Sequence, residues 1–411
     1  MKFQKLMAML EPTPRAGVAL VAAAALFVSA GAELKAQSAP AVDEARFAYV
    51  GTYTRGAPGG WSAAARDEAP VGVTVWSVGA GMGDLSLVQT VPIDSPSWVT
   101  MHPSQDFLYV LNEIQDYGGE KRGSIEAYGI DNETGELSFI NRATTGGIPA
   151  QIVVNPAGDY LAVATYTGAT YEVLPIGDNG SLSEASSIAA QEGSGPHRRQ
   201  GSPHPHAVAF DQSGRYLATA DLGTDWVKVF TYDGGNLQEV SAVQMAPGSG
   251  PRHVAFGAGD AALYVINELT ATISVHDFDG STGQLGDAKQ LVSTVPANYP
   301  SHKSTAEIMV HPSGKFLYAS NRKFEDHALA DSIVTYSVAE DGTLRLVGFA
   351  THPDVRMPRT FNIDPTGTWL YGLGQKGDTI VQFHINPLTG ALTPTGQVSR
   401  TKVPVSMAFK Q

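Results

Sequence analysis

Short runs of apolar and β-branched residues, each ended by a proline or glycine turn, follow one another from residue 46 to the end of the chain. Some runs alternate apolar and polar side chains, as in VKVFTY (227–232) and TIVQFHI (379–385). This two-residue period is typical of a β-strand with one buried face. Other runs, such as FLYVL (107–111) and LYVIN (263–267), are rich in β-forming residues. The pattern predicts an all-β fold of many short strands.

The predicted strands recur in a fixed order, which defines a structural unit. Each unit opens with a strand such as HAVAF (206–210), and a turn such as HPSGK (311–315) leads to a second strand such as FLYAS (316–320). A third, alternating strand follows, and then a Gly-x-Leu turn and a fourth strand. The order predicts four antiparallel strands in every unit.

The Gly-x-Leu turn recurs seven times, at spacings of 45 to 59 residues. A period near 50 residues with several strands per repeat is typical of a β-propeller. The turns begin at Gly83, Gly135, Gly180, Gly235, Gly283, Gly342 and Gly390.

Six units are complete between residues 96 and 395, and the seventh is split between the two ends of the chain. RFAYVGTY (46–53) is a second strand without a first, and PVSMAFK (404–410) is a first strand without a partner. Pairing of the two strands would close the ring and leave no open sheet edge. We therefore predict one seven-bladed β-propeller domain over residues 45–411, and we expect a monomer.

The first 36 residues do not follow this pattern. Basic residues precede an uncharged apolar run over 17–30, which suits the hydrophobic region of a signal peptide and is short for a membrane span. Cleavage is expected near residue 32 or near residue 36. Residues 1–36 therefore predict export to the periplasm or the medium, with no membrane attachment after cleavage.

Composition narrows the range of functions. The 44 glycines and 25 prolines favour many turns over a helical protein. The absence of cysteine excludes disulfides, thiolate metal sites and a cysteine nucleophile. The net charge of −13, without a basic block, argues against nucleic-acid binding.

Propeller topology sorts the loops into two faces. The links between blades and the loops from second to third strands share one face, where they surround the central opening. These segments carry arginine, histidine and carboxylate side chains, which would orient an anionic substrate and supply a general acid and base. The expected substrate-binding residues are His206, Asp221, Asp225, Glu307, Arg359 and Gln375.

Other kinds of site are disfavoured at this opening. His204 and His206, with His197 nearby, have the residue types that ligate zinc or copper, but we do not expect a metal site here. No G-x-S-x-G elbow occurs, so a serine hydrolase mechanism has no support. The insertion at 55–69 lies on the same face and is either a lid or a flexible loop.

Five short strings occur in the loops of this face: PHPH (203–206), DLGTD (221–225), GPRH (250–253), NEL (267–269) and SNR (320–322). Together they resemble the seven-bladed β-propeller lactonase family, which includes bacterial 6-phosphogluconolactonases of the propeller type and 3-carboxy-cis,cis-muconate cyclase. The resemblance extends from about Phe47 to Phe409. It implies that a lactone is hydrolysed or formed without a metal or an organic cofactor.

The resemblance also implies a catalytic set. The proposed His, Arg, Glu and Arg of the muconate cyclase resemble His204, Arg252, Glu268 and Arg322, with Arg359 as a competitor for the last position. The arginines would bind an anionic group and stabilise the oxyanion that forms when water adds to the lactone carbonyl. One of His204 and Glu268 would take the proton from water, and the other would protonate the leaving alkoxide.

Two observations bear on the substrate. The sequence has TYTGA at 165–169, where the family usually has Asn-Tyr-x-Gly-Gly. In addition, 6-phosphogluconolactone is made in the cytosol, so a sugar lactone without phosphate or a carboxylated lactone is expected for an exported protein. The alternative functions are a lactone-forming cyclase of the carboxymuconate type and a non-catalytic extracytoplasmic binding propeller.

Overall fold

The computed structural model describes residues 44–55, 71–299, 304–322 and 331–411. The chain divides into two units, Met1–Ala41 and Val42–Gln411, and the described residues belong to the second. The predicted signal peptide (1–36) and nearly all of the 55–69 insertion lie outside the described residues and stay predictions. Within the described ranges, no helix is long and apolar enough to cross a membrane.

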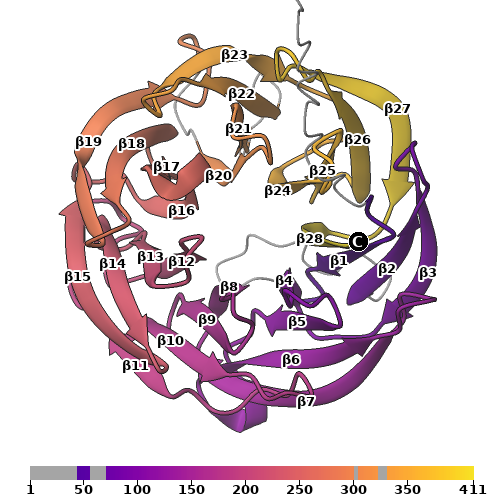
Figure 1. Cartoon of the computed structure of the whole chain (residues 1–411), viewed down its shortest axis with the longest axis horizontal. Helices are drawn as coiled ribbons and strands as arrows, with labels where there is room; N and C mark the ends of the chain where they lie inside the picture. Colours follow the sequence, from indigo (N-terminus) through magenta and orange to yellow (C-terminus); the bar gives the residue numbers. More distant parts are fainter. Residues whose placement is uncertain (1–43, 56–70, 300–303, 323–330) are drawn as a thin grey trace, which may run out of the picture. The chain divides into compact units, whose positions relative to one another are not determined.

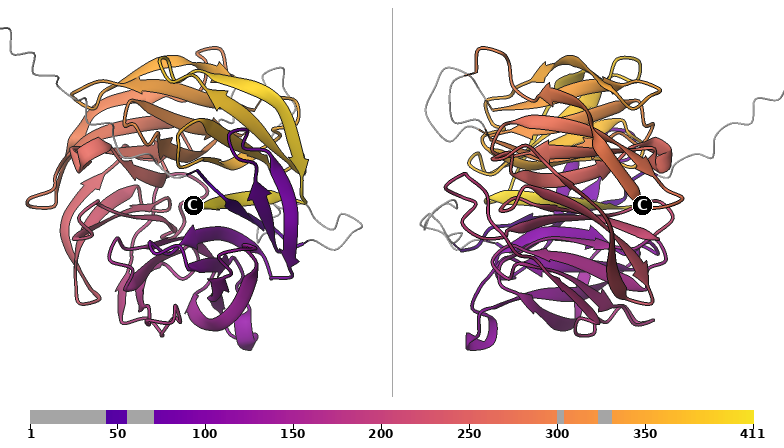
Figure 2. Two further views of the ribbon diagram at one scale, coloured as in Figure 1. Left: turned by 45° about the vertical axis from the view of Figure 1, so that its right-hand side comes forward. Right: turned by 90° about the vertical axis from the view of Figure 1, so that its left-hand side faces the viewer.

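The strands of the second unit form seven four-stranded antiparallel sheets, which surround a common axis as the blades of a propeller (Figure 1). Figure 2 presents the same ring from two further directions, with loops at both of its faces. The first strand of each blade is innermost and the fourth is outermost. The predicted seven-bladed all-β architecture is confirmed.

The first four blades have the following strands. The first contains β28 (Pro404–Lys410), β1 (Phe47–Thr52), β2 (Val73–Val78) and β3 (Leu85–Val91). The second contains β4 (Pro96–Met101), β5 (Phe107–Asn112), β6 (Arg122–Ile130) and β7 (Leu137–Gly146). The third contains β8 (Pro149–Val154), β9 (Tyr160–Thr165), β10 (Thr170–Pro175) and β11 (Ser187–Ala190). The fourth contains β12 (Pro205–Phe210), β13 (Tyr216–Asp221), β14 (Trp226–Asp233) and β15 (Asn236–Gln244).

The remaining three blades complete the ring. The fifth contains β16 (Pro251–Phe256), β17 (Ala262–Asn267), β18 (Thr272–Asp279) and β19 (Gln284–Ser293). The sixth contains β20 (Thr305–Val310), β21 (Phe316–Asn321), β22 (Ser332–Val338) and β23 (Leu344–Ala350). The seventh contains β24 (Pro358–Ile363), β25 (Trp369–Gly374), β26 (Thr379–Ile385) and β27 (Leu392–Arg400). Two short 3₁₀ turns, η1 (Tyr117–Gly119) and η2 (Ala258–Asp260), lie in loops.

The ring closes by pairing of the two ends of the propeller, as the sequence predicts. β28 pairs antiparallel with β1, with Phe47 opposite Lys410 and Gly51 opposite Ser406. The pairing completes the first blade, which therefore has four strands like the other six.

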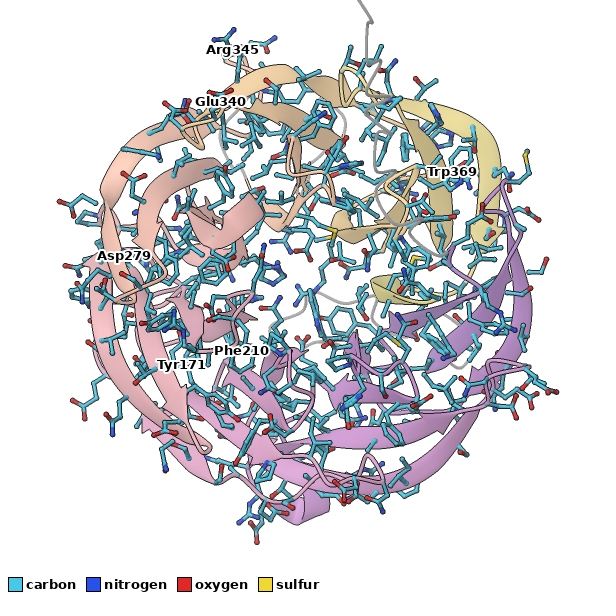
Figure 3. All side chains as sticks on the ribbon, viewed as in Figure 1. Tyr171, Phe210, Asp279, Glu340, Arg345 and Trp369 are labelled. Atoms are coloured by element: carbon cyan, nitrogen blue, oxygen red, sulfur yellow. The ribbon has the colours of Figure 1, made fainter. Side chains whose placement is uncertain are left out.

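The hydrophobic core lies between neighbouring blades. Tyr49 and Val75 of the first blade, for example, pack with Leu108 and Val110 of the second in one cluster of buried side chains. Side chains such as Tyr171 are buried between blades, whereas Asp279, Glu340 and Arg345 are exposed at the outer edge (Figure 3).

The recurring Gly-x-Leu turn has a structural cause in contacts between blades. The second-strand tyrosine Tyr49 donates its phenol hydrogen to Gly135 O of the next blade at 3.0 Å, and Tyr109 and Tyr318 make the equivalent bonds to Gly180 and Gly390. Gly135 has φ +75°, and a Cβ atom there would lie 2.4 Å from the Phe47 ring. Only glycine fits this position, because both the backbone conformation and the neighbouring ring exclude a side chain.

Candidate active site

A cavity of about 190 Å³ lies at the centre of the ring, and all seven blades contribute to its wall. This volume is roughly a dozen times the space that one water molecule needs. The wall is made by second-to-third loops, first-strand starts and three links between blades, which is the face on which the sequence places the site. A ligand of monosaccharide size fits such a space.

The first group of wall residues occupies one equivalent position in every blade, directly after the last residue of the second strand. In six of the seven blades the backbone N–H of this residue donates to a carbonyl just before the first strand; Tyr166 bonds Ile148 O at 2.8 Å, and Glu268 bonds Gly250 O at 2.7 Å. The shared bond fixes the direction of the side chain. All members except Leu222 line the cavity, and the group is Tyr53, Glu113, Tyr166, Leu222, Glu268, Arg322 and Gln375.

The second group of wall residues comes from β-bulges at the start of the first strands. The pairing shifts by one residue there in all seven blades, for example between Pro205 and Ala207 in β12. Bulges redirect a side chain, often beside a functional site. His206 and Arg359 line the cavity from two of the bulges, Arg252 occupies a third and lies behind Glu268, and the small Ala150 in a fourth leaves space for a ligand.

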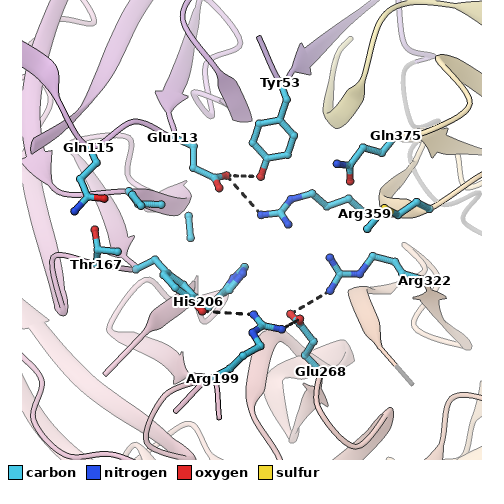
Figure 4. Close-up of a pocket in the computed structure, with 14 residues that line it drawn as sticks. Tyr53, Glu113, Gln115, Thr167, Arg199, His206, Glu268, Arg322, Arg359 and Gln375 are labelled. Carbon is cyan, nitrogen blue, oxygen red and sulfur yellow. Dashed lines mark hydrogen bonds and ion pairs between the residues drawn. The ribbon is translucent and has the colours of Figure 1, made fainter. Parts of the chain in front are cut away.

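Glu268 is the centre of a buried ion-pair cluster on one wall (Figure 4). Its Oε2 lies 3.1 Å from Arg252 Nε and 3.1 Å from Arg322 Nη2, and its Oε1 pairs with Arg199 Nη1. Burial alone would raise the pKa of this carboxyl, but Arg199, Arg322 and Arg252 together hold its pKa well below the ordinary value. Glu268 is therefore a permanent anion at neutral pH.

The arginines around Glu268 are in excess of the carboxylates. Burial, together with Arg359 and Arg322, lowers the pKa of Arg252 to about 9, and burial also lowers the pKa of Arg322. The guanidiniums of Arg199, Arg322 and Arg359 all line the cavity, against two carboxylates. An anionic ligand would relieve the mutual repulsion of these cations, so the cavity favours an anion.

The opposite wall carries a smaller polar group (Figure 4). Tyr53 Oη donates a hydrogen bond of 2.7 Å to Glu113 Oε2, and Arg359 Nη2 lies 3.5 Å from the same oxygen. The Arg359 guanidinium also stacks over the Tyr53 ring, 5.3 Å from its centroid. Burial raises the pKa of the Tyr53 phenol, which therefore stays protonated as a hydrogen-bond donor.

The two histidines of the PHPH string have different surroundings. His206 lines the cavity, its Nδ1 has no hydrogen-bond partner among the described residues, and burial lowers its pKa well below 6.5. His204 stacks on the Tyr166 ring at 4.1 Å and donates from Nδ1 to Tyr166 O at 3.1 Å. His204 is not among the residues that line the cavity, although the sequence predicts that it acts on the substrate.

Glu307 lies behind the wall, although the sequence predicts that it binds substrate. Arg252 Nη1 lies 3.0 Å from His253 Nε2, and because an arginine only donates, Nε2 is the acceptor. The proton of neutral His253 is then on Nδ1, which donates to Glu307 Oε1 at 2.9 Å. Glu307 also accepts from Thr360 and so fixes the support beneath Arg252.

This arrangement predicts a pH-dependent stability. Burial lowers the pKa of His253 to about 4 in the folded protein, whereas an unfolded histidine titrates near 6.5. Between pH 4 and pH 6.5 the unfolded chain binds more protons than the folded protein. The free energy of unfolding should therefore fall by about 3 kcal/mol as the pH is lowered from 6.5 toward 4. Thermal unfolding between pH 4 and pH 7 measures the effect.

His253→Gln is the informative variant for that experiment, because an amide can accept from Arg252 and donate to Glu307 without titrating. Its melting temperature should fall less with acid than that of the wild type. The exposed His384→Gln serves as the control, with an unchanged pH dependence. Equal pH dependence in His253→Gln and in the wild type would contradict the neutral His253.

The structure also corrects the predicted roles of Asp221 and Asp225. Asp221 Oδ1 accepts from the backbone N–H groups of His204 and Gly223, at 2.7 and 2.8 Å. Asp225 accepts from the backbone N–H groups of Gly248 and Gly250 and from Gln200. Both carboxylates are buried and fix loops, and neither lines the cavity.

Of the other residues predicted from the sequence, Glu268, Arg322, Arg359, His206 and Gln375 line the cavity, and Arg252 lies behind Glu268. The site predicted from the sequence did not include Tyr53, Glu113, Tyr166 and Arg199, all of which line the cavity. Tyr53, Glu113 and Tyr166 each directly follow the second strand of a blade. The sequence shows this shared position when the second strands of all blades are aligned. In the described ranges, no group of three or more histidine and carboxylate side chains is suited to hold a metal ion.

The chain is similar to known proteins over nearly its whole length. A 6-phosphogluconolactonase of Bacillus subtilis is 29% identical over 88% of this chain and 97% of its own, and one of Formosa agariphila is 31% identical over 84% and 94%. The structure of a periplasmic gluconolactonase of Pseudomonas aeruginosa superimposes with a TM-score of 0.78 at 28% identity, covering 88% of this chain and 98% of that one. The family described as lactonase, seven-bladed β-propeller, matches residues 47–409. The chain therefore belongs to the seven-bladed β-propeller lactonase family.

Proposed function

We propose that the protein hydrolyses a lactone in the central cavity, and that the substrate is a sugar-derived or carboxylated lactone. The observation that carries the proposal is the excess of guanidiniums over carboxylates in a cavity of monosaccharide size. Guanidinium groups match the planar geometry of carboxylates and stabilise the oxyanion that develops when water attacks an ester carbonyl. The substrates named for the relatives, 6-phosphogluconolactone and gluconolactone, support a sugar lactone.

In this mechanism Arg322 and Arg359 act on the substrate directly. Arg322 reaches the cavity from the end of β21, and Arg359 reaches it from the bulge of β24. One guanidinium would hold the lactone carbonyl oxygen and stabilise its negative charge in the transition state, while the other would bind the polar or anionic substituent of the ring. The protein supplies this chemistry from its own side chains.

Glu268 has an electrostatic function in this proposal and does not transfer protons. Its carboxylate is shared among three arginines and its pKa is held low, so it is a poor base, and as a permanent anion it has no proton to donate. Instead it fixes the directions of Arg199, Arg252 and Arg322. Glu268 is therefore not suited to take the proton from water, and His204 is not among the residues that line the cavity.

Acid release in a pH-stat tests the function, with gluconolactone, its 6-phosphate and carboxylated muconolactones as substrates. We expect a rate well above the spontaneous one for at least one of these lactones. If no lactone is hydrolysed faster than background, hydrolysis is refuted. Incubation with carboxylated muconates then tests the cyclase reaction, and a negative result there would leave a binding propeller.

We also propose that the mature protein is exported and monomeric. The proposal of export rests on the apolar run at 17–30 and its flanking charges, and that of a monomer rests on the closed ring. Mass spectrometry of the protein from the periplasm or medium should find an N-terminus near residue 33 or 37. Light scattering during size exclusion should give the mass of one chain.

A further inference from the structure

We propose that Glu113 is the general base of the reaction, with Oε1 as the atom that removes a proton from the attacking water. The assignment rests on the proposed lactonase function and adds to it a residue outside the set implied by the family resemblance. Glu113 follows β5 and faces the cavity from the wall opposite Glu268 (Figure 4).

The first argument is the different use of the two cavity carboxylates. Glu268 has ion pairs on both oxygens, and its side chain is 4% exposed. Glu113 is engaged through Oε2 alone, with Tyr53 and Arg359, and its side chain is 9% exposed. No described residue bonds Glu113 Oε1, so this oxygen remains available to a water molecule in the cavity.

The second argument compares Glu113 with His206. These are the two side chains of the wall that could accept a proton, because Glu113 has one oxygen without a described partner and His206 is uncharged. Proton uptake by His206 creates a cation in a fully buried position, and burial and Arg252 both oppose it. His206 is therefore a poor acceptor for the proton, which leaves Glu113 with its Oε1 directed at the cavity.

Glu113 alone can carry out every proton transfer that the reaction needs. Oε1 takes one proton from water as the new C–O bond forms at the lactone carbonyl, and the oxyanion lies near the arginines. Collapse of the tetrahedral intermediate breaks the ring C–O bond, and the leaving alkoxide takes the proton from Glu113. The product acid then releases a proton to solvent, which the pH-stat records.

Tyr53 and Arg359 position the base. The 2.7 Å hydrogen bond from Tyr53 holds Oε2, and this leaves Oε1 directed at the cavity. Tyr53→Phe should therefore lower kcat about tenfold while the acidic limb of the pH–rate profile persists, because the base itself is intact.

The experiment compares Glu113→Gln with the wild type on the best lactone of the panel. We expect kcat to fall about 10²-fold or more with KM nearly unchanged, and the acidic limb of the kcat profile to disappear. Added formate should raise the rate of Glu113→Ala at least about tenfold, since a small carboxylate can occupy the vacated space. Glu136→Gln, an exposed carboxylate outside the cavity, is the matched control and should keep the wild-type rate.

The outcomes separate this assignment from the proposed function. An active wild type together with a Glu113→Gln rate within about threefold of it overturns the assignment alone. A slower Glu113→Gln that retains the acidic limb overturns it in favour of His206. An inactive wild type overturns the lactonase function and the assignment together. If Glu113→Gln does not fold, the formate response of Glu113→Ala decides, and the absence of rescue in a folded Glu113→Ala contradicts the role.

Discussion

Replacing Arg322 by alanine is expected to lower kcat/KM for lactone hydrolysis by about 10²–10³-fold, the loss typical of removing one oxyanion donor. Arg322 Nη2 bonds Ser304 Oγ and Thr305 O at 3.0 Å and pairs with Glu268, so the guanidinium is held in place before substrate binds. A preorganised donor stabilises the transition state without reorganisation during the reaction. Arg322→Lys keeps the charge but not the planar fork and should recover only part of the rate.

Steady-state kinetics on the best substrate measure this effect, with Arg142→Ala as the matched control. Arg142 pairs with the buried Glu126, so its loss also leaves a buried carboxylate without its arginine, but outside the cavity. The control should lose stability and keep its kcat/KM. A comparable loss of kcat/KM in both variants would mean that Arg322 acts through folding and not through the transition state.

The Glu268→Gln variant is expected to lose about 3–5 kcal/mol of stability, the cost of leaving buried charges without their partner. The side chains of Arg252 and Arg322 are 2% and 4% exposed, and both lose their carboxylate in this variant. The three guanidiniums of the cluster would then repel one another in a site with little water. This loss is larger than that expected for any surface ion pair of the molecule.

Chemical denaturation, or the melting temperature where unfolding is irreversible, measures the loss. Glu239→Gln is the control, because Glu239 forms an exposed pair with Lys228 and should contribute at most about 1 kcal/mol. Phosphate should stabilise Glu268→Gln more than the wild type, since an anion can take the place of the missing carboxylate. A loss below about 1 kcal/mol would show that the arginines do not depend on Glu268.

The fold could be predicted because each blade repeats the same contacts. The Gly-x-Leu spacing is visible in the sequence since Tyr49, Tyr109 and Tyr318 each require a glycine carbonyl in the next blade. Closure by residues 404–410 was likewise predictable, because only one strand at each end lacked a partner.

The site could be predicted in part, because short polar strings mark some loop residues and not others. Arg322 and Glu268 lie in such strings, whereas Glu113 and Tyr53 do not, and their side chains meet only when the first and second blades are side by side. Arg199 enters from a link between blades, whose path the repeat does not determine.

The errors have a common physical origin. Asp221, Asp225 and Glu307 have the right chemistry for a ligand site, yet all three are buried outside the cavity wall. Backbone N–H groups donate to Asp221 Oδ1 and to Asp225, and His253 donates to Glu307. A sequence shows which loop side chains can accept hydrogen bonds. It does not show which of them will bond to the backbone N–H groups of the same loop.

The two groups of equivalent wall positions make the cavity modular. Every blade has one residue directly after its second strand and one at its bulge, and six residues of the first group and three of the second line the cavity. A change of substrate can thus arise by substitution at single positions, without insertions or a new loop. Leu222, Ala150 and Ser97 occupy such positions without charged chemistry, and they are the natural starting points for evolving or engineering a different specificity onto the same ring.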